Sequence, residues 1–175
     1  MLTINVAQQL KESIGAEREY ELSGRVDIDG KESTVEGQVK LTRTDRGIVV
    51  EAHVTGKMKI ACSRCLAEFD HPLSLNFEEE YLQTVDMASG GKLSLPGDCG
   101  NFTTDARHNL DLSEAVRQYA LLSVPIKPLC RKKCAGLCPH CGQNLNQGQC
   151  QCPSAQVDPR WAPLLELKDK LKGKG

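Results

Sequence analysis

Apolar and polar residues alternate along much of the first two thirds of the chain. The alternating runs cover residues 20–28, 35–41, 48–62 and 69–81. Alternation with a period of two is typical of strands that bury one face, and the pair Asp29-Gly30 between the first two runs is typical of a tight hairpin turn. The pattern therefore predicts four successive strands in an antiparallel meander, the third of them bent at Gly56.

A helix is predicted over residues 111–123, where apolar residues recur at helical spacing. Asp111 can cap its first turn, and Glu114 stands three residues later, as in a capping box. Pro125 ends the pattern. We expect the apolar stripe of this helix to cover the sheet.

Two further helices are expected, a weaker one over 4–14 and one over 159–171. Residues 82–109 lose the alternation and contain several glycines, which predicts a loop. The chain has no apolar run long enough to span a membrane and no basic start followed by an apolar core, so the sequence favours a cytoplasmic protein without a membrane partner.

Nine cysteines in 175 residues are the unusual part of the composition. Because cytosolic thiols are kept reduced, clustered cysteines favour metal binding or redox chemistry over structural disulfides. Six of the nine lie within residues 130–152.

The segment Cys138-Pro-His-Cys141-Gly142 has the form of a zinc knuckle, with two thiolates two residues apart and a glycine that permits the turn. Cys150 and Cys152 follow after a polar loop and complete our first choice of ligands for one structural Zn²⁺. Cys130 and Cys134 are competing ligands. An iron–sulfur cluster is the alternative metal, because thiolates suit it too. His140, inside the knuckle, is expected to face solvent.

Cys62 and Cys65 form a second C-x-x-C pair where the third predicted strand turns back. Three interpretations remain open for this thiol pair: two small residues in a tight reversal, a metal-binding pair that acts alone or with a spare pair from the C-terminal cluster, and a reversible redox switch. A redox dithiol gains reactivity at a helix N-terminus, which a turn between strands does not provide. Cys99 is expected to be a free thiol.

Motifs of the common enzyme classes are absent from the sequence: it has no phosphate-binding loop, no GxSxG, no HExxH and no dinucleotide glycine pattern. The run 78–80 of three glutamates is interpreted as a solvated strand edge, because consecutive strand residues face opposite ways. We therefore expect no catalysis and no small-molecule substrate.

Charge divides the chain into two parts. Residues 1–120 hold thirteen Lys and Arg against twenty Asp and Glu, whereas residues 121–175 hold nine against three. A basic segment suits a phosphate backbone, and with aromatics at 4% recognition of RNA by shape and charge is favoured over base stacking. The expected RNA contacts are Arg131, Lys132, Lys133, Lys168, Lys170 and Lys172.

Several segments together resemble one known family. They are ACSRCLAEFDHPL followed by FEEEY, LDLSEAVRQYALLSVPIKPLC, CAGLCPHCGQNLN and DPRWAPLLELK. In this order they are similar to the YceD family, the large ribosomal RNA subunit accumulation proteins, over about residues 20–172. The resemblance implies a non-enzymatic cytosolic protein of bacteria, or a plastid relative, that supports accumulation of the large-subunit (23S) ribosomal RNA.

These observations predict an α+β fold: an antiparallel β-meander packed by a helix over residues 1–125, then a small cysteine-rich zinc lobe and a basic terminal helix over 126–175. The favoured function is a ribosome-biogenesis factor that binds precursor large-subunit particles through ribosomal RNA, ribosomal proteins or both. The alternatives are a zinc-stapled adaptor that binds only protein and a thiol redox switch at Cys62 and Cys65.

Overall fold

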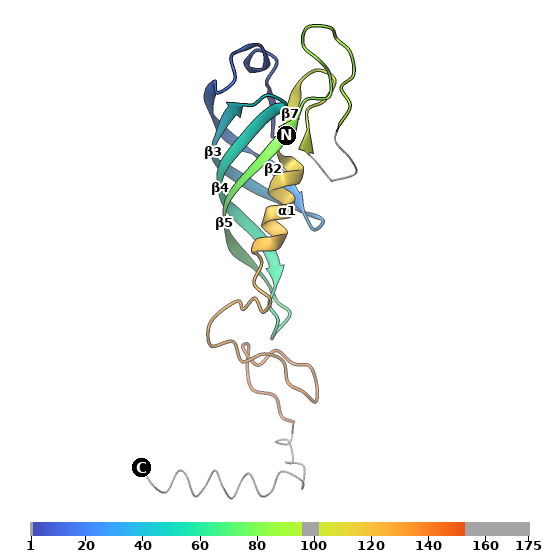
Figure 1. The fold of residues 1–175 in the computed structure, drawn as a ribbon. Helices are drawn as coiled ribbons and strands as arrows, with labels where there is room; N and C mark the ends of the chain where they lie inside the picture. The colour runs from blue at the N-terminus through green and yellow to red at the C-terminus, as the bar shows by residue number, and fades with distance from the viewer. Residues whose placement is uncertain (1, 96–101, 153–175) are drawn as a thin grey trace, which may run out of the picture.

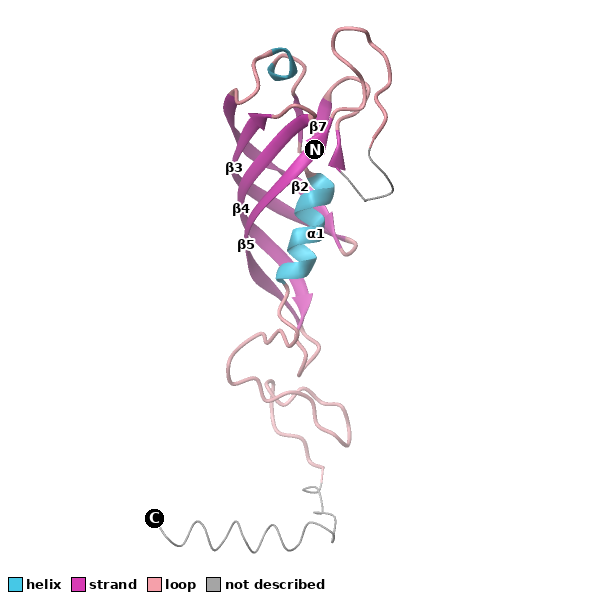
Figure 2. Ribbon diagram, viewed as in Figure 1, coloured by secondary structure: helices cyan, strands magenta, loops and turns pink. Residues whose placement is uncertain are grey.

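The structure is a computed structural model that describes residues 2–95 and 102–152. Two sheets, one α-helix and an irregular C-terminal segment make up these residues (Figures 1 and 2). In chain order the elements are β1 (Thr3–Asn5), the short 3₁₀ helix η1 (Gln9–Lys11), β2 (Glu17–Ile28), β3 (Lys31–Arg43), β4 (Gly47–Ala61), β5 (Glu68–Leu82), β6 (Phe102–Thr103), β7 (Asn109–Asp111) and α1 (Ser113–Ser123).

The main sheet contains the four predicted strands, paired antiparallel in the order β2-β3-β4-β5. The hairpin turn predicted between β2 and β3 is confirmed: Asp29 and Gly30 both have positive φ, 56° and 75°, as a two-residue hairpin turn requires. The prediction of a purely antiparallel sheet was wrong in one respect. A fifth strand, β6, pairs parallel to β5, so the sheet is mixed.

Two local predictions before α1 were wrong. Residues 4–14 are not a helix, because β1 pairs antiparallel with β7 in a second sheet and is followed only by η1. The buried residues Leu2, Val6 and Leu10 stand four apart, which imitates a helical stripe although the backbone is extended at β1. The region 82–109 is likewise not all loop, since it includes β6 and β7.

Helix α1 follows β7 directly and shares a core with the main sheet. Its residues Ala115, Val116 and Ala120 belong to the same buried cluster as the inward residues of β2 to β5, and Tyr119 stacks on Phe77 of β5 with ring centroids 4.7 Å apart. Figure 1 shows α1 lying across one face of the sheet.

The ends of α1 differ in part from the prediction. Leu112 occupies the N-cap position, and the Asp111 carboxylate accepts a hydrogen bond from the Ser113 N–H at 2.9 Å. The capping box does not form, because the Glu114 carboxylate binds Arg117 instead, at 2.7 Å. The helix ends before Val124, which is extended as expected for a residue that precedes proline.

The chain then runs from α1 past the turn between β4 and β5 and continues as the C-terminal segment, residues 124–152 (Figure 1, orange). Within this segment one bridge pairs Leu137 with Asn144. The predicted helix over 159–171 lies outside the described residues. Among the residues that are described, no helix is both long and apolar enough to cross a membrane.

Candidate metal centres

Eight cysteines lie in two groups of four, and in each group all four sulfur atoms are within 4.8 Å of one another. We call Cys62, Cys65, Cys130 and Cys134 the hairpin centre, and Cys138, Cys141, Cys150 and Cys152 the knuckle centre. Cys99 lies outside the described residues. The structure thus brings together the four ligands of the predicted zinc site, and it separates Cys130 and Cys134 from them by placing these two with Cys62 and Cys65.

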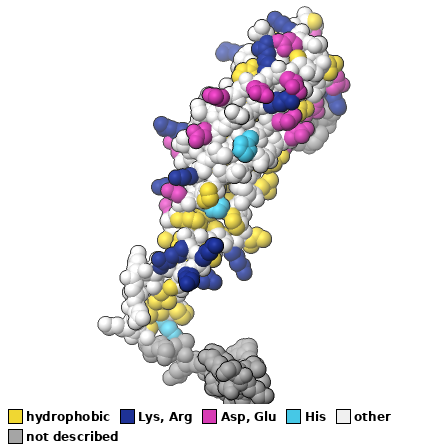
Figure 3. All heavy atoms as spheres, turned by 90° about the vertical axis from the view of Figure 1, so that its left-hand side faces the viewer, with side chains coloured by type: hydrophobic (Ala, Val, Ile, Leu, Met, Phe, Trp, Pro, Cys, Tyr) yellow, Lys and Arg dark blue, Asp and Glu magenta, His cyan; other side chains and the backbone are white. Residues whose placement is uncertain are grey.

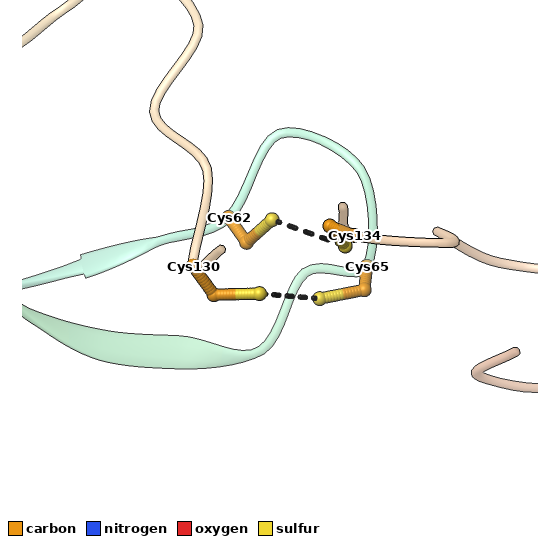
Figure 4. A group of neighbouring side chains, drawn as sticks. All are labelled: Cys62, Cys65, Cys130 and Cys134. Atoms are coloured by element: carbon orange, nitrogen blue, oxygen red, sulfur yellow. Dashed lines mark hydrogen bonds between the residues drawn. The ribbon is translucent and has the colours of Figure 1, made fainter. Parts of the chain in front are cut away.

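The hairpin centre joins two segments that are far apart in sequence (Figure 4). Cys62 and Cys65 flank the turn between β4 and β5, and Cys130 and Cys134 come from the C-terminal segment. The sulfur atoms face one another, with 3.8 Å from Cys62 to Cys134 and 3.8 Å from Cys65 to Cys130. The apolar side chains of Phe69, Leu129 and Leu137 pack around them as a small cluster separate from the main core.

Hydrogen bonds from the turn hold the C-terminal segment beside this centre. The Ser63 N–H and hydroxyl both donate to the Pro128 carbonyl, at 2.8 and 2.9 Å. The Arg64 guanidinium donates to the Cys134 carbonyl at 3.0 Å. Gly136 lies against Arg64 with φ +79°, and a Cβ there would come within 3.3 Å of the Arg64 carbonyl oxygen. The segment therefore follows the tip of the hairpin closely.

The knuckle centre is built from the C-terminal segment alone. The His140 N–H donates to the Cys138 sulfur at 3.4 Å, and the His140 side chain is not among the clustered ligands and is exposed. Cys138 is buried whereas Cys141 is exposed. This centre is thus more open to solvent than the hairpin centre, where three of the four cysteines are buried.

Backbone N–H groups favour the thiolate form at the first cysteine of each C-x-x-C pair. They lower the pKa of Cys62 to about 6, the largest effect coming from the N–H of Cys130. The N–H groups of Cys141 and His140 likewise lower the pKa of Cys138 to about 6. Burial raises the pKa of Cys130 to about 12. Each centre therefore offers a preformed thiolate, the species that binds metal.

Asn146 connects the two centres. Its side-chain N–H donates to the Cys134 sulfur at 3.3 Å, and its side-chain oxygen accepts the Ala135 N–H at 2.9 Å and the Arg131 guanidinium. The backbone adds a bond from the Leu145 N–H to the Gly136 carbonyl at 2.9 Å. Sequence reasoning missed this role, because a lone asparagine in a polar loop has no distinctive pattern.

Each group of four cysteines can hold a metal ion. Four thiolates at these separations suit Zn²⁺, and they also suit iron–sulfur chemistry. An all-cysteine set with no open position is typical of structural rather than catalytic metal.

Of the expected RNA-binding residues, the structure describes three, Arg131, Lys132 and Lys133, and all three are exposed beside the hairpin centre. Lys168, Lys170 and Lys172 lie outside the described residues. Arg64 and Lys127 are exposed in the same region, and Figure 3 shows Lys and Arg side chains gathered where the sheet meets the C-terminal segment. Sequence reasoning missed Arg64 because it belongs to the acidic half of the chain.

A profile of the family described as large ribosomal RNA subunit accumulation protein YceD matches residues 50–168. The chain belongs to the YceD family. The match extends from β4 through both cysteine groups, so the candidate centres lie within the part that the family shares.

One relative named for the same family also matches, and two uncharacterized relatives match over more of the chain. The chain is 32% identical over 65 residues to the large ribosomal RNA subunit accumulation protein YCED homolog 1, chloroplastic, of Arabidopsis thaliana, which covers 37% of this chain and 20% of the relative. It is 26% identical over 139 residues to uncharacterized proteins of Mycobacterium bovis and Mycobacterium tuberculosis, covering 77% of this chain and 64% of each relative. The chain thus spans less than two thirds of the length of these relatives. No solved structure matches it.

Proposed function

We propose that this protein is a non-enzymatic, cytoplasmic factor that supports accumulation of large-subunit (23S) ribosomal RNA by binding precursor large-subunit particles. The family description supports the process. The observation that carries the binding mode is the exposed basic cluster of Arg64, Lys127, Arg131, Lys132 and Lys133 around the hairpin centre.

Charge in this region is one-sided. Residues 124–152 contain four Lys and Arg and no Asp or Glu. Among the described residues, no carboxylate forms an ion pair with Lys132 or Lys133, in contrast to Lys31 and Lys40, which pair with Glu68 and Glu17. Exposed, unpaired cations suit contacts with phosphates.

A structural metal ion would stabilise the segment that carries these cations. We propose that Cys138, Cys141, Cys150 and Cys152 hold one structural Zn²⁺, which makes residues 126–175 a zinc lobe with a basic tail beside the sheet and helix of residues 1–125. Binding of metal to such a segment contributes its folding free energy. Lys132 and Lys133 lie outside the knuckle centre, so zinc there can position them only through contacts within the lobe. The hydrogen bonds of Asn146 to the Cys134 sulfur and the Ala135 N–H supply such contacts.

The lowered pKa of Cys62 suits a redox-active thiol, but the burial of the pair opposes the redox alternative. Cys62 is 0% exposed and Cys65 is 5% exposed, whereas redox-active thiols are accessible to their partners. The protein-only adaptor shares the fold and the metal with the RNA-binding factor. Only the dependence of binding on the exposed cations and on salt separates these two functions.

Two charge-reversal variants provide this test. Their binding to purified precursor large-subunit particles is measured over a salt series and compared. One is Lys132→Glu/Lys133→Glu, which keeps the hydrogen bonds of the Arg131 guanidinium to the Asn146 side chain. The control is Lys11→Glu/Arg46→Glu, the same change in charge at positions near the opposite end of the sheet.

The first variant should bind weakly, and the control should bind as the wild type does. For each phosphate that Lys132→Glu/Lys133→Glu no longer binds, the log–log salt slope should shrink by about 0.7 to 0.9. Unchanged binding and slope in this variant, with its zinc content intact, would remove these lysines from the RNA interface and favour the adaptor.

A further inference from the structure

The knuckle at Cys138–Cys141 shows the backbone geometry that a C-x-x-C pair adopts here. The Cys138 N–H donates to the Gln143 carbonyl at 2.8 Å, and the Gly142 N–H donates back to the Cys138 carbonyl at 2.9 Å. Gly142, the residue after the second cysteine, has φ +73°. This left-handed residue turns the chain so that N–H groups face the first sulfur, as the bond from His140 shows.

The turn between β4 and β5 repeats both of these backbone–backbone hydrogen bonds. The Cys62 N–H donates to the Ala67 carbonyl at 2.9 Å, and the Leu66 N–H donates to the Cys62 carbonyl at 2.9 Å. Leu66, again the residue after the second cysteine, has φ +57°. The tip of the hairpin is therefore a second knuckle, which the sequence conceals because leucine replaces the usual glycine.

Packing does not explain why Leu66 adopts the left-handed conformation. Leucine is strained there because its Cβ crowds the backbone, and the Leu66 side chain is 66% exposed, so it gains little from burial. Strain of this kind persists where the surrounding structure requires it, and it is concentrated at ligand sites.

The sulfur positions fit a tetrahedral metal site. With Zn–S bonds of about 2.3 Å, the edge of a ZnS₄ tetrahedron is about 3.8 Å long. The separations of Cys62 from Cys134 and of Cys65 from Cys130 are both 3.8 Å. Two of the six sulfur–sulfur separations thus equal the edge of a zinc tetrahedron, and all six are within 4.8 Å.

We propose that Cys62, Cys65, Cys130 and Cys134 bind a second structural Zn²⁺, which fastens the tip of the β4–β5 hairpin to the C-terminal segment. Zn²⁺ binds the four thiolates, and the protons of thiols that are still protonated pass to solvent. Arg64 and Arg131 lie nearby and offset the net charge of about −2 of such a centre. This inference does not depend on the proposed role in ribosome biogenesis.

Metal analysis of the full-length protein, purified under reducing conditions without chelator, gives the first test. We expect two zinc ions per chain in the wild type and in the control Cys99→Ser. We expect one in Cys62→Ser/Cys65→Ser and one in Cys138→Ser/Cys141→Ser. One zinc per chain in the wild type that persists in Cys62→Ser/Cys65→Ser would overturn the proposal, as would iron in place of zinc.

A second measurement keeps the proposal testable if the double serine variants fail to fold. Apo protein titrated with Co²⁺ should develop the absorption of tetrahedral cobalt thiolate up to two equivalents. Cys130→His keeps four ligands, so it should still bind two Co²⁺ ions while the absorption of one centre changes to that of a Cys₃His site. A spectrum that is unchanged in Cys130→His, with saturation at one equivalent in the reduced wild type, would show that the hairpin centre binds no metal.

Discussion

The sulfur atoms of Cys62 and Cys134 lie 3.8 Å apart although 72 residues separate them in sequence. This contact, with that of Cys65 and Cys130, joins the end of a long hairpin to a segment with almost no regular secondary structure. The apolar cluster around these sulfurs is separate from the core beneath α1. The protein is thus a sheet with its own core, to which a cysteine-rich segment is attached at one end.

Because the two clusters are separate, removal of metal should release the C-terminal segment and leave the sheet folded. After treatment with a chelator under reducing conditions, hydrogen exchange should become fast at the Ser63 N–H, which donates to Pro128, and at the Cys138 N–H. The amides between β3 and β4 should remain protected. Loss of protection throughout the sheet would contradict two independent clusters, and so would unchanged exchange at Ser63.

Replacement of Leu66 by glycine should stabilise the hairpin tip. Left-handed φ costs leucine about 1–2 kcal/mol, and the entropy of a glycine in the unfolded chain offsets part of the gain, which leaves about 1 kcal/mol. Leu66→Ala is the matched control, because it loses the same exposed side chain and keeps the Cβ. Chemical denaturation of the metal-loaded protein should rank Leu66→Gly above both Leu66→Ala and the wild type. Equal stability of the two variants would show that the left-handed turn is not strained.

Gly136→Ala should weaken the packing of the segment against the hairpin. Alanine meets two obstacles there, a left-handed φ and a carbonyl oxygen of Arg64 that would be 3.3 Å from its Cβ. Gly90→Ala is the control, since Gly90 has φ +69° with no atom within 4 Å of the added carbon. Both variants should lose about 1–2 kcal/mol from the strained φ, and Gly136→Ala should lose more. Equal losses in thermal unfolding would argue against close contact between Gly136 and Arg64.

Asn146→Ala should lower zinc affinity at the hairpin centre, because it removes the N–H that donates to the Cys134 sulfur. Loss of a partner outside the ligand shell typically costs about 10- to 100-fold in metal affinity. Competition with a chromophoric chelator measures this, and Cys138→Ser/Cys141→Ser as the background isolates the hairpin centre. Gln147→Ala, an exposed neighbour, should leave the affinity unchanged. The expectation fails if the two alanine variants bind zinc equally well.

The strands of the main sheet were predicted well from the sequence, because each buries one face and the alternation records it, as at Val35, Val39 and Leu41 of β3. The prediction failed near the N-terminus, where pairing with β7 overrides a helix-like spacing of Leu2, Val6 and Leu10. Short strands such as β6 carry too few residues for a pattern to be visible.

The knuckle centre could be predicted because its four cysteines lie within fifteen residues of one another and a glycine follows the first pair. The hairpin centre could be described only as two unassigned pairs. No local sequence pattern indicates that these two pairs come together. The contact depends on the strand register and on the path of the chain after α1. In addition, the first pair is followed by Leu66 and not by the glycine that is typical of a knuckle.

If this chain supports accumulation of the large ribosomal subunit through the basic cluster beside the hairpin centre, its loss must change the balance of ribosomal RNAs. The most direct measurement is the ratio of mature large-subunit to small-subunit ribosomal RNA in cells of the natural host that lack the protein. The ratio should fall, and it should be restored by the wild type and by Lys11→Glu/Arg46→Glu but not by Lys132→Glu/Lys133→Glu at equal protein level. A normal ratio without the protein, or full restoration by Lys132→Glu/Lys133→Glu, would contradict this role.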